Sequence, residues 1–263
     1  MLGSKQTLTA SSWRQAAASI HETVSPRQLD QRIEQTVAQV VETTKNKNVA
    51  YAWSGGKDAI ALQKIMDLAG IHDAVLVHTN LEYPGFLQWA QENKPQRLTY
   101  INTGQDYDWL RQRPHMLFPR GRDASAWFRM VQHKGQRDYF RNNDLDLIAL
   151  GRRRRDGNYT GPKGADTYTD RNGVTRWSPL ADWTHEEVIA LHARYRLTLP
   201  PIYGTPRGFQ VGTGPWPARP GTSPDPDAPN YGWRELWNID PGLVQTAADE
   251  NLPGAQDFVR RNK

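Results

Sequence analysis

Residues 49–59 read Val-Ala-Tyr-Ala-Trp-Ser-Gly-Gly-Lys-Asp-Ala, and this stretch decides the fold. An apolar run ends abruptly at Ser54, where two glycines, a lysine and an aspartate follow. Apolar residues then recur at helical spacing from Ala61 to Ala69, and Gly70 is a typical helix stop. The stretch therefore predicts a strand, a tight glycine loop and a helix, in that order.

The glycine loop has the chemistry of an anion site. The N-terminus of a helix presents free amide donors and the positive end of the helix dipole. Gly55 and Gly56 let the backbone close around an anion because neither carries a Cβ, and we expect Lys57 to add a mobile positive charge. The spacing is not that of the common P-loop or of the Gly-x-Gly-x-x-Gly pattern. We predict an oxyanion or phosphate site; the alternative is a tight strand-to-helix turn whose glycines bind nothing.

Composition excludes several classes of chemistry. The chain has 263 residues and no cysteine, which removes disulfides, thiolate nucleophiles, persulfides, cysteine-ligated zinc and cysteine-held iron–sulfur clusters. Its 33 basic and 28 acidic residues give a formal charge of +5, which permits a polyanionic partner without requiring one. No apolar run approaches the roughly 18 residues of a membrane span, and residues 1–10 do not read as a secretory signal. We therefore expect a cytoplasmic protein with no membrane partner.

The rest of the chain alternates strand and helix patterns. Buried strands are predicted at 73–80 and 145–150 and a third, shorter strand at 98–102, with helices at 86–91 and 123–142. This alternation is typical of a doubly wound, mostly parallel α/β sheet of the Rossmann-like kind. In such sheets ligands bind beyond the carboxyl ends of the strands, so the polar residues after each strand are the candidates for a site.

Three parts are predicted along the chain. Residues 1–47 read as helices, the clearest of which begins at a capping box formed by Ser25 and Gln28. Residues 48–199 hold the α/β pattern and are expected to form the domain that carries the glycine loop. Residues 200–263 begin with a Pro/Gly-rich segment, either a lid over the site or a flexible tail, and end in short helices.

A run of four arginines, Arg152, Arg153, Arg154 and Arg155, directly follows the strand predicted at 145–150. Their forked donors suit phosphate, sulfate or a nucleic-acid backbone. We expect this loop to open at the same edge of the sheet as the glycine loop, which favours an anion site. The alternative is a solvated basic loop without a ligand.

Several segments, in the same order along the chain, resemble the phosphoadenosine phosphosulfate reductase family and its relative, the small subunit of sulfate adenylyltransferase. Residues 54–58 resemble the Ser-Gly-Gly-x-Asp-Ser pyrophosphate loop of the wider adenine nucleotide alpha hydrolase superfamily. Residues 78–84 stand where the family has Asp-Thr-Gly-x-x-Phe-Pro, and residues 151–156 resemble its Gly/Ala-x-Arg-Arg-x-Glu segment. Residues 179–184 match Pro-Leu-x-x-Trp-Thr closely, and residues 199–203 match Leu-Pro-x-x-Pro-Leu-Tyr loosely.

The resemblance implies an adenine nucleotide alpha hydrolase-like fold that binds ATP or a related adenine nucleotide, with Mg²⁺. Cleavage between the α and β phosphates would adenylate an acceptor such as sulfate, a carboxylate or a nucleobase carbonyl. Lys57 and Asp58 are the implied catalytic residues, and Arg152 to Arg155 would hold the acceptor or the leaving phosphates. The implied nucleotide-binding residues are Ser54, Gly55, Gly56, Lys57, Asp58, Ala59, Thr79 and Asn80. No histidine spacing predicts a metal site held by the protein alone.

The chain also departs from the family at chemically important positions. Ala59 stands where Ser or Thr is usual, so one hydroxyl donor to phosphate is missing, and His78 and Asn80 replace Asp and Gly. A sulfonucleotide reductase attacks sulfur with a C-terminal cysteine, which this chain lacks. We therefore expect adenylyl transfer without thiol chemistry. The alternative is a catalytically degenerate nucleotide-binding module that acts with a partner protein or nucleic acid.

Overall fold

The computed structural model describes residues 8–221, 228 and 231–262, which fall into two compact units. Unit 1 comprises Met1–Val77, Gln88–Ile101 and Gln136–Thr213. Unit 2 comprises His78–Leu87, Asn102–Gly135 and Gly214–Lys263. Each unit is therefore built from three separate stretches of chain. The division at 1–47, 48–199 and 200–263 stays a prediction about how the chain is organised.

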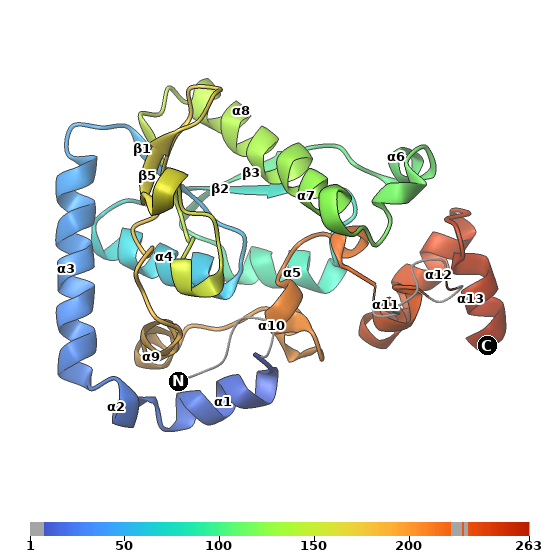
Figure 1. Ribbon diagram of the computed structural model, residues 1–263, viewed down its shortest axis with the longest axis horizontal. Coiled ribbons are helices and arrows are strands. Elements are labelled where there is room, and N and C mark those ends of the chain that lie inside the picture. Colours follow the sequence, from blue (N-terminus) through green and yellow to red (C-terminus); the bar gives the residue numbers. More distant parts are fainter. Residues whose placement is uncertain (1–7, 222–227, 229–230, 263) are drawn as a thin grey trace. The chain divides into compact units, whose positions relative to one another are not determined.

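A six-stranded sheet in the order β3-β2-β1-β4-β6-β5 is the frame of unit 1 (Figure 1). Strand β1 pairs in parallel with β2 and with β4, β4 pairs in parallel with β6, and β5 is an antiparallel edge strand on β6. The order reverses beside β1, whose neighbours are β2 on one side and β4 on the other. The predicted doubly wound, mostly parallel α/β fold is confirmed, and β1 lies at its switch point. The strands are Val49–Ala52 (β1), Asp73–His78 (β2), Arg97–Asn102 (β3), Leu147–Leu150 (β4), Thr167–Thr169 (β5) and Thr175–Trp177 (β6).

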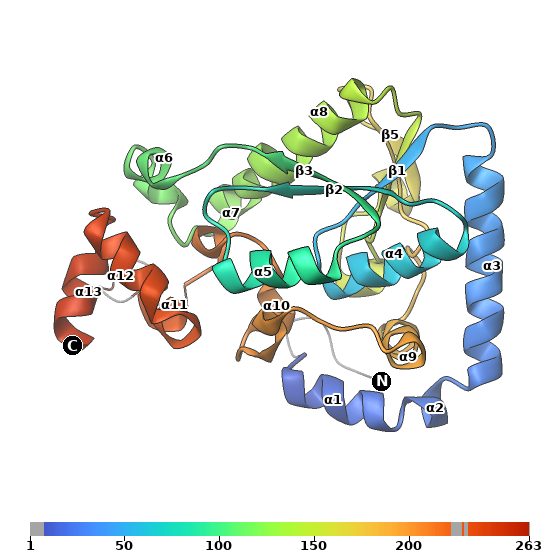
Figure 2. The same ribbon diagram turned by 180° about the vertical axis from the view of Figure 1, so that it is seen from behind.

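Helices cover both faces of this sheet, with α4 on one face and α8 on the other (Figures 1 and 2). On the α4 side, α9 packs against α1, α2, α3 and α4. All four residues of β4 are buried, because the strand is covered on both faces. The helices are Ala10–Ala18 (α1), Ile20–Thr23 (α2), Pro26–Thr44 (α3), Lys57–Leu68 (α4), Pro84–Asn93 (α5), Lys134–Asn142 (α8), His185–Tyr195 (α9) and Gly208–Val211 (α10).

Helices α3 and α9 both begin at capping boxes, and the box at Ser25 and Gln28 is the one predicted above. The Ser25 hydroxyl accepts from the Gln28 amide at the start of α3, and the Thr184 hydroxyl accepts from the Glu187 amide at the start of α9. Between these two helices, the buried Trp183 indole donates to the Thr36 hydroxyl over 3.1 Å. This hydrogen bond fixes the start of α9 against α3, and these two helices support the glycine loop.

Unit 2 is mostly helical and has an aromatic core. The ring of Phe118 lies 4.9 Å from the ring of Trp233 and 6.2 Å from that of Trp216, and all three side chains are buried. The helices are Tyr107–Arg111 (α6), Gly121–Phe128 (α7), Trp233–Ile239 (α11), Pro241–Asp249 (α12) and Ala255–Asn262 (α13). The single helix predicted at 123–142 is wrong in one respect, because a π-helical turn at Arg129–His133 separates α7 from α8.

The Pro/Gly-rich segment that begins at residue 200 forms short helical turns where it is described. These are Pro201–Gly204, α10 and Trp216–Ala218. Residues 222–227 and 229–230 lie outside the described part, so the lid or tail stays a prediction. A search of the described helices for one long and apolar enough to cross a bilayer finds none.

Candidate functional site

The glycine loop lies between the end of β1 and the start of α4, as the sequence predicts. Gly55 has a φ of 64°, a left-handed conformation that a residue with a Cβ rarely adopts. Gly56 has an ordinary φ of −73° and is the N-cap of α4, so its backbone does not require glycine. At Gly56 the side-chain hydroxyls lie close instead: an ideal Cβ would lie 3.2 Å from the Ser54 hydroxyl oxygen and 3.3 Å from that of Tyr203.

Three hydroxyls surround Gly56. Those of Ser54 and Tyr203 flank the position of the absent Cβ, and the Thr213 oxygen would lie 3.7 Å from it. Thr213 donates its hydrogen to the Ser54 carbonyl over 2.7 Å, which fixes the loop backbone. Ser54, Gly56 and Thr213 are half-buried and Tyr203 is buried; the group of Ser54, Tyr203 and Thr213 around Gly56 is called the hydroxyl cradle below.

Tyr203 extends the N-terminus of α4 by one hydrogen-bonding group. The Lys57 amide donates to the Tyr203 hydroxyl oxygen over 2.9 Å. Burial raises the pKa of this phenol, so it keeps its proton at neutral pH. No described residue accepts that proton. Tyr203 therefore accepts from the helix and has one O–H left to donate to a ligand.

A balanced group of four charges lies behind the loop. The Lys57 ammonium is 2.5 Å from an Asp58 carboxylate oxygen and 3.0 Å from one of Asp156. The Arg153 Nε is 2.7 Å from the other Asp58 oxygen, and its Nη2 is 3.5 Å from Asp156. The Lys57 side chain is 3% exposed and that of Arg153 is fully buried. The expectation that Lys57 carries a mobile charge is wrong, because burial and two carboxylates hold it in place.

These contacts keep Asp58 ionised. Burial alone would raise the pKa of its carboxyl, but the nearby Lys57 ammonium and Arg153 guanidinium overcome that effect, and the pKa lies well below its ordinary value. The charges of the four groups cancel in a formal count of two cations and two anions. The group of Lys57, Asp58, Arg153 and Asp156, called the charge network below, thus holds the loop in shape rather than projecting charge to solvent.

Helix α9 contributes two histidines to the same region. The His192 Nε2 lies 2.8 Å from the Lys57 carbonyl oxygen, and the His185 Nδ1 lies 3.2 Å from the Arg153 Nη2. Burial lowers the pKa of both imidazoles, and Arg153 and Lys57 lower that of His185 further. Both histidines are therefore neutral at pH 7 and support the network by hydrogen bonding.

The four arginines are not equivalent. Arg153 belongs to the charge network, and it also donates to the Trp183 carbonyl. Arg152 donates to the Tyr159 carbonyl and the Tyr168 hydroxyl, and burial lowers its pKa. Arg154 pairs with Asp182 and with the Gly164 carbonyl. Arg155 is exposed and has no hydrogen bond or ion pair to any described residue.

The arginine loop packs closely on the glycine loop at Gly151. An ideal Cβ at Gly151 would lie 2.7 Å from the Asp58 carbonyl oxygen, a contact that real side chains do not make. Glycine at this position lets the end of β4 approach the first turn of α4. The structure thus brings residues 151–156 and 54–58 together within unit 1.

Thr79 and Asn80 belong to unit 2, where they follow the last residue of β2. The Thr79 amide and hydroxyl both donate to one carboxylate oxygen of Glu82, over 3.0 and 3.1 Å. Burial raises the pKa of Glu82 to about 8, although the two hydrogen bonds from Thr79 act in the opposite direction. The Asn80 side chain accepts from Asn102. Contacts of Thr79 and Asn80 with a nucleotide stay a prediction.

Sequence reasoning missed five residues of this site: Asp156, Tyr203, Thr213, His185 and His192. Tyr203 ends the 199–203 segment that carries part of the resemblance, so a signal for it existed. Nothing in the local sequence identifies Thr213, which lies 159 residues after its hydrogen-bond partner Ser54. The two histidines lie far from the loop in sequence and share no ligand pattern with it.

The motifs and the geometry agree with a comparison across known families. A sequence profile of the phosphoadenosine phosphosulfate reductase domain matches residues 48–210, more than half of the chain. The chain belongs to this family. Within the family it is a member without cysteine. The match spans the glycine loop, the arginine loop and Tyr203, and it ends before Thr213. A comparison with curated proteins gives no match.

Solved structures similar to this chain include three enzymes. Phosphoadenylyl-sulfate (PAPS) reductase from Candida auris is 12% identical, with 76% of this chain and 93% of that chain covered and a TM-score of 0.48. NMN synthetase from Francisella tularensis is 12% identical, with coverage of 81% and 86% and a TM-score of 0.49. NAD+ synthetase from Burkholderia pseudomallei is 15% identical, with coverage of 95% and 95% and a TM-score of 0.47.

Proposed function

We propose that this protein binds ATP or a related adenine nucleotide, with the polyphosphate on the loop at residues 54–58, and transfers the adenylyl group to an acceptor. The hydroxyl cradle around Gly56 carries the proposal. Hydroxyls gathered around a glycine at a helix N-terminus are donors that suit an oxyanion. Membership of the phosphoadenosine phosphosulfate reductase family supports the choice of an adenine nucleotide.

The donors for phosphate come from two hydroxyls and the helix. Tyr203 accepts from the Lys57 amide and so points its remaining O–H away from that amide. The Ser54 oxygen lies 3.4 Å from the Gly56 amide, which leaves the Ser54 hydrogen free to donate as well. These two donors compensate for the hydroxyl that Ala59 lacks. The dipole of α4 adds a favourable potential for negative charge.

The charge network has an indirect part in this proposal. Lys57 and Asp58 position the loop, and their charges are already balanced by each other and by Arg153 and Asp156. Arg155, which has no described partner, would attract the acceptor or the leaving pyrophosphate. In the reaction, an acceptor oxygen attacks the α-phosphorus, the bond from that phosphorus to the bridging oxygen of the β phosphate breaks, and pyrophosphate leaves.

The described residues do not form a ready magnesium site. Mg²⁺ prefers oxygen ligands, of which proteins commonly supply one or two carboxylates. Both oxygens of Asp58 contact cations, and one oxygen of Asp156 contacts Lys57. No group of three or more potential ligands is found among the described residues. Any Mg²⁺ would therefore enter with the nucleotide, bound to its phosphates.

Turnover of ATP labelled in the α phosphate tests the proposal. The purified protein is incubated with Mg²⁺ and labelled ATP, alone and with sulfate, amino acids, tRNA or DNA. We expect AMP or an adenylate, together with pyrophosphate, and a loss of about tenfold or more in Tyr203→Phe. Tyr159→Phe removes an equivalent hydroxyl from an exposed side chain and is expected to leave turnover unchanged. No binding of ATP to the wild-type protein would overturn the proposal.

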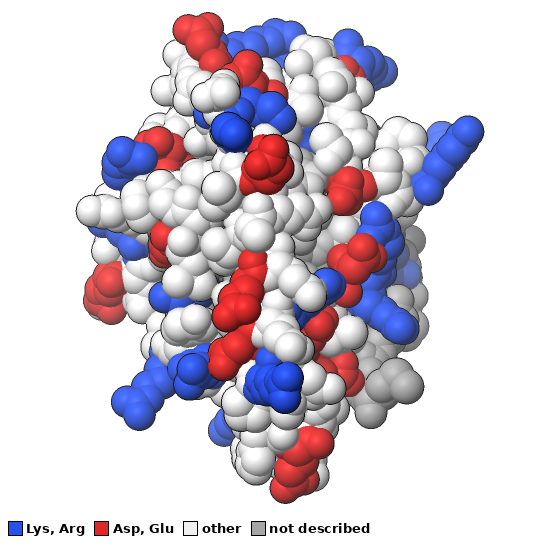
Figure 3. All heavy atoms as spheres, turned by 90° about the vertical axis from the view of Figure 1, so that its left-hand side faces the viewer, with Lys and Arg blue, Asp and Glu red and all other residues white. Residues whose placement is uncertain are grey.

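A nucleotide-binding module without turnover is the second candidate. One observation favours it: the two side chains expected to be catalytic, Lys57 and Asp58, are both engaged inside the charge network. ATP binding that depends on Tyr203, with no product under any condition, would select this candidate. A nucleic-acid partner has weaker support. On the face in Figure 3, the basic side chains of the described residues are interspersed with acidic ones instead of forming a one-sign field.

A further inference from the structure

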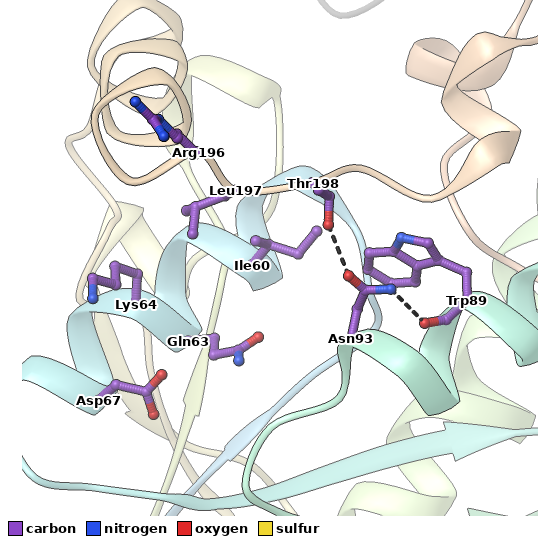
Figure 4. A pocket seen from close by; sticks show the side chains of 9 residues that line it. All are labelled: Ile60, Gln63, Lys64, Asp67, Trp89, Asn93, Arg196, Leu197 and Thr198. Atoms are coloured by element: carbon purple, nitrogen blue, oxygen red, sulfur yellow. Dashed lines mark hydrogen bonds between the residues drawn. The ribbon is translucent and has the colours of Figure 1, made fainter.

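A second pocket lies along the outer side of α4, within unit 1 and away from the glycine loop (Figure 4). Its volume is about 310 Å³, at the lower end of the range typical of small-molecule sites, about 300–1,000 Å³. It is lined by α4, by the last two turns of α5 and by the segment that follows α9. A cavity of this size suits a small organic molecule rather than a nucleotide.

One wall of this outer pocket is apolar and held firmly. It consists of Trp89, Ile60 and Leu197. The Trp89 ring is parallel to that of Trp53 to within 5°, with 5.9 Å between the ring centroids. Trp53 is itself fixed, because its indole nitrogen donates to the Gln63 side-chain oxygen over 2.8 Å. An indole held in this way is a preformed surface for a flat apolar group.

The backbone around this wall is also tied down. The Asn93 amide nitrogen donates to the Trp89 carbonyl over 2.9 Å, and the Asn93 oxygen accepts from the Thr198 hydroxyl over 2.8 Å. Both contacts are drawn in Figure 4. They join α5 to the segment after α9 across one side of the pocket. The distance between the wall and that segment is therefore set without a ligand.

The opposite side of the pocket is basic. Figure 4 shows Lys64 and Arg196 on the side away from Trp89. The Lys64 ammonium lies 4.2 Å from the centroid of the Tyr195 ring, and no described residue accepts a hydrogen bond from it. Arg196 is exposed and likewise has no acceptor among the described residues. Gln63 uses only its oxygen, so its amide hydrogens remain as donors.

The one acidic side chain in the lining already has a partner. An Asp67 carboxylate oxygen lies 3.3 Å from the His72 Nδ1. Two cations and one anion give the lining a formal charge of +1. The free donors at this end outnumber the free acceptors and the net charge is positive, so this end suits an anionic acceptor. A planar carboxylate matches the fork of a guanidinium better than it matches any other group here.

We propose that this outer pocket binds a small aryl or indolyl carboxylate, with its ring on Trp89 and its carboxylate between Lys64 and Arg196. The ring stacks on an indole whose far face is supported by Trp53. The carboxylate receives donors from both cations and from the Gln63 amide. Trp53 directly precedes Ser54, so the site lies behind the glycine loop without sharing a side chain with it.

Indole-3-propionate is the probe, and isothermal calorimetry with the full chain and no nucleotide is the measurement. We expect measurable binding that falls by about tenfold or more in the double variant Lys64→Gln/Arg196→Asn. Asn is chosen at Arg196 because its φ of 51° tolerates that residue. Trp89→Leu is expected to weaken binding by a similar factor. Lys45→Ala, which removes an exposed charge elsewhere, is expected to have no effect.

Matched ligands define the class. The neutral amide of the probe is expected to bind about tenfold more weakly, and the amine analogue tryptamine not at all. Asp67→Asn is expected to strengthen binding of the carboxylate, because it removes a like charge; a weaker affinity there would point to a zwitterion and overturn the class. Inorganic phosphate that binds as tightly as the probe would overturn the role of the aromatic wall. Absence of probe binding to the folded wild-type protein would overturn the site itself.

Discussion

Helix α4 carries a lysine near its start and another in its second half, and the two are held in opposite ways. Lys57 is buried and contacts two carboxylates, those of Asp58 and Asp156. Lys64 is half-buried, lies over the Tyr195 ring and has no carboxylate partner among the described residues. The first lysine shapes the loop on which we propose the polyphosphate binds. The second is available to a ligand in the outer pocket.

The difference shows why the type of a residue alone does not reveal its role. A buried charge is tolerated only when other charges and hydrogen bonds balance it, so Lys57 has become part of the framework. A charge at the surface is balanced by water and can exchange that water for a ligand. The same reasoning separates Arg153, which is fully buried and paired, from Arg155, which is exposed.

The largest expected effect on stability comes from replacing Lys57 by methionine, and the same replacement of Lys64 is its matched control. Lys57→Met removes the ammonium that contacts the carboxylates of Asp58 and Asp156, and we expect it to lower the free energy of unfolding by about 3–5 kcal/mol. Lys64→Met removes a cation with no ionic partner, and we expect a change within about 0.5 kcal/mol. Urea denaturation of both variants measures the contrast. Equal losses would mean that the two lysines are not held differently.

Glu82 is a buried carboxylate that, unlike Asp58, has no ionic partner among the described residues. Its pKa is raised by burial from 4.5 to about 8, so the folded state retains a proton that the unfolded state releases. Stability therefore falls as the pH rises through this window, by an amount on the order of 5 kcal/mol. The change of stability with pH that is due to Asp58 has the opposite sign. Its pKa is lowered, so its contribution is present above its ordinary value and is lost as the pH falls below that value.

The variant Glu82→Gln separates the contribution of Glu82 to the pH dependence of stability from that of Asp58. Glutamine keeps an oxygen that accepts from Thr79 but does not titrate, so the decline in stability between about pH 5 and pH 8 is expected to shrink. Denaturation of the wild-type protein and the variant across this range provides the measurement. An unchanged slope in the variant would show that Glu82 is not the titrating group.

Gly151→Ala breaks the contact between the arginine loop and the first turn of α4. The new Cβ would lie 2.7 Å from the Asp58 carbonyl oxygen, and the backbone must shift to admit it. We expect a destabilisation of about 1–3 kcal/mol. Gly85→Ala is the control, because a Cβ there meets nothing within 4 Å. Thermal denaturation distinguishes the two, and equal melting temperatures would contradict the close approach at Gly151.

Local patterns in the sequence were sufficient for the strand, the glycine loop and the helix that follows. Apolar periodicity and the capping residues Ser25 and Thr184 act over a few neighbouring positions, so they can be read directly. The π-helical turn at 129–133 has no comparable local signal. The edge strand β5 pairs with β6 across a turn that holds Asn172 and Gly173, a local hairpin signal that the strand prediction did not use.

The environment of the site residues could not be predicted in the same way. Nothing near Lys57 in the sequence indicates that Asp156, 99 residues away, holds its ammonium. The Tyr203 hydroxyl, 146 residues away in the sequence, accepts a hydrogen bond from the Lys57 amide. Whether an arginine binds a ligand or a carboxylate of its own chain depends on such long-range contacts, so four adjacent arginines read alike in the sequence and differ in the structure.

The most direct test of the proposed nucleotide site is calorimetric binding of ATP with Mg²⁺ to the wild-type protein and to Gly56→Ala. Alanine is compatible with the backbone at Gly56, where φ is −73°, but its Cβ occupies the space between the Ser54 and Tyr203 hydroxyls. We predict that the variant keeps its melting temperature and loses about tenfold or more in affinity. Equal affinity of the two proteins for ATP would contradict the account.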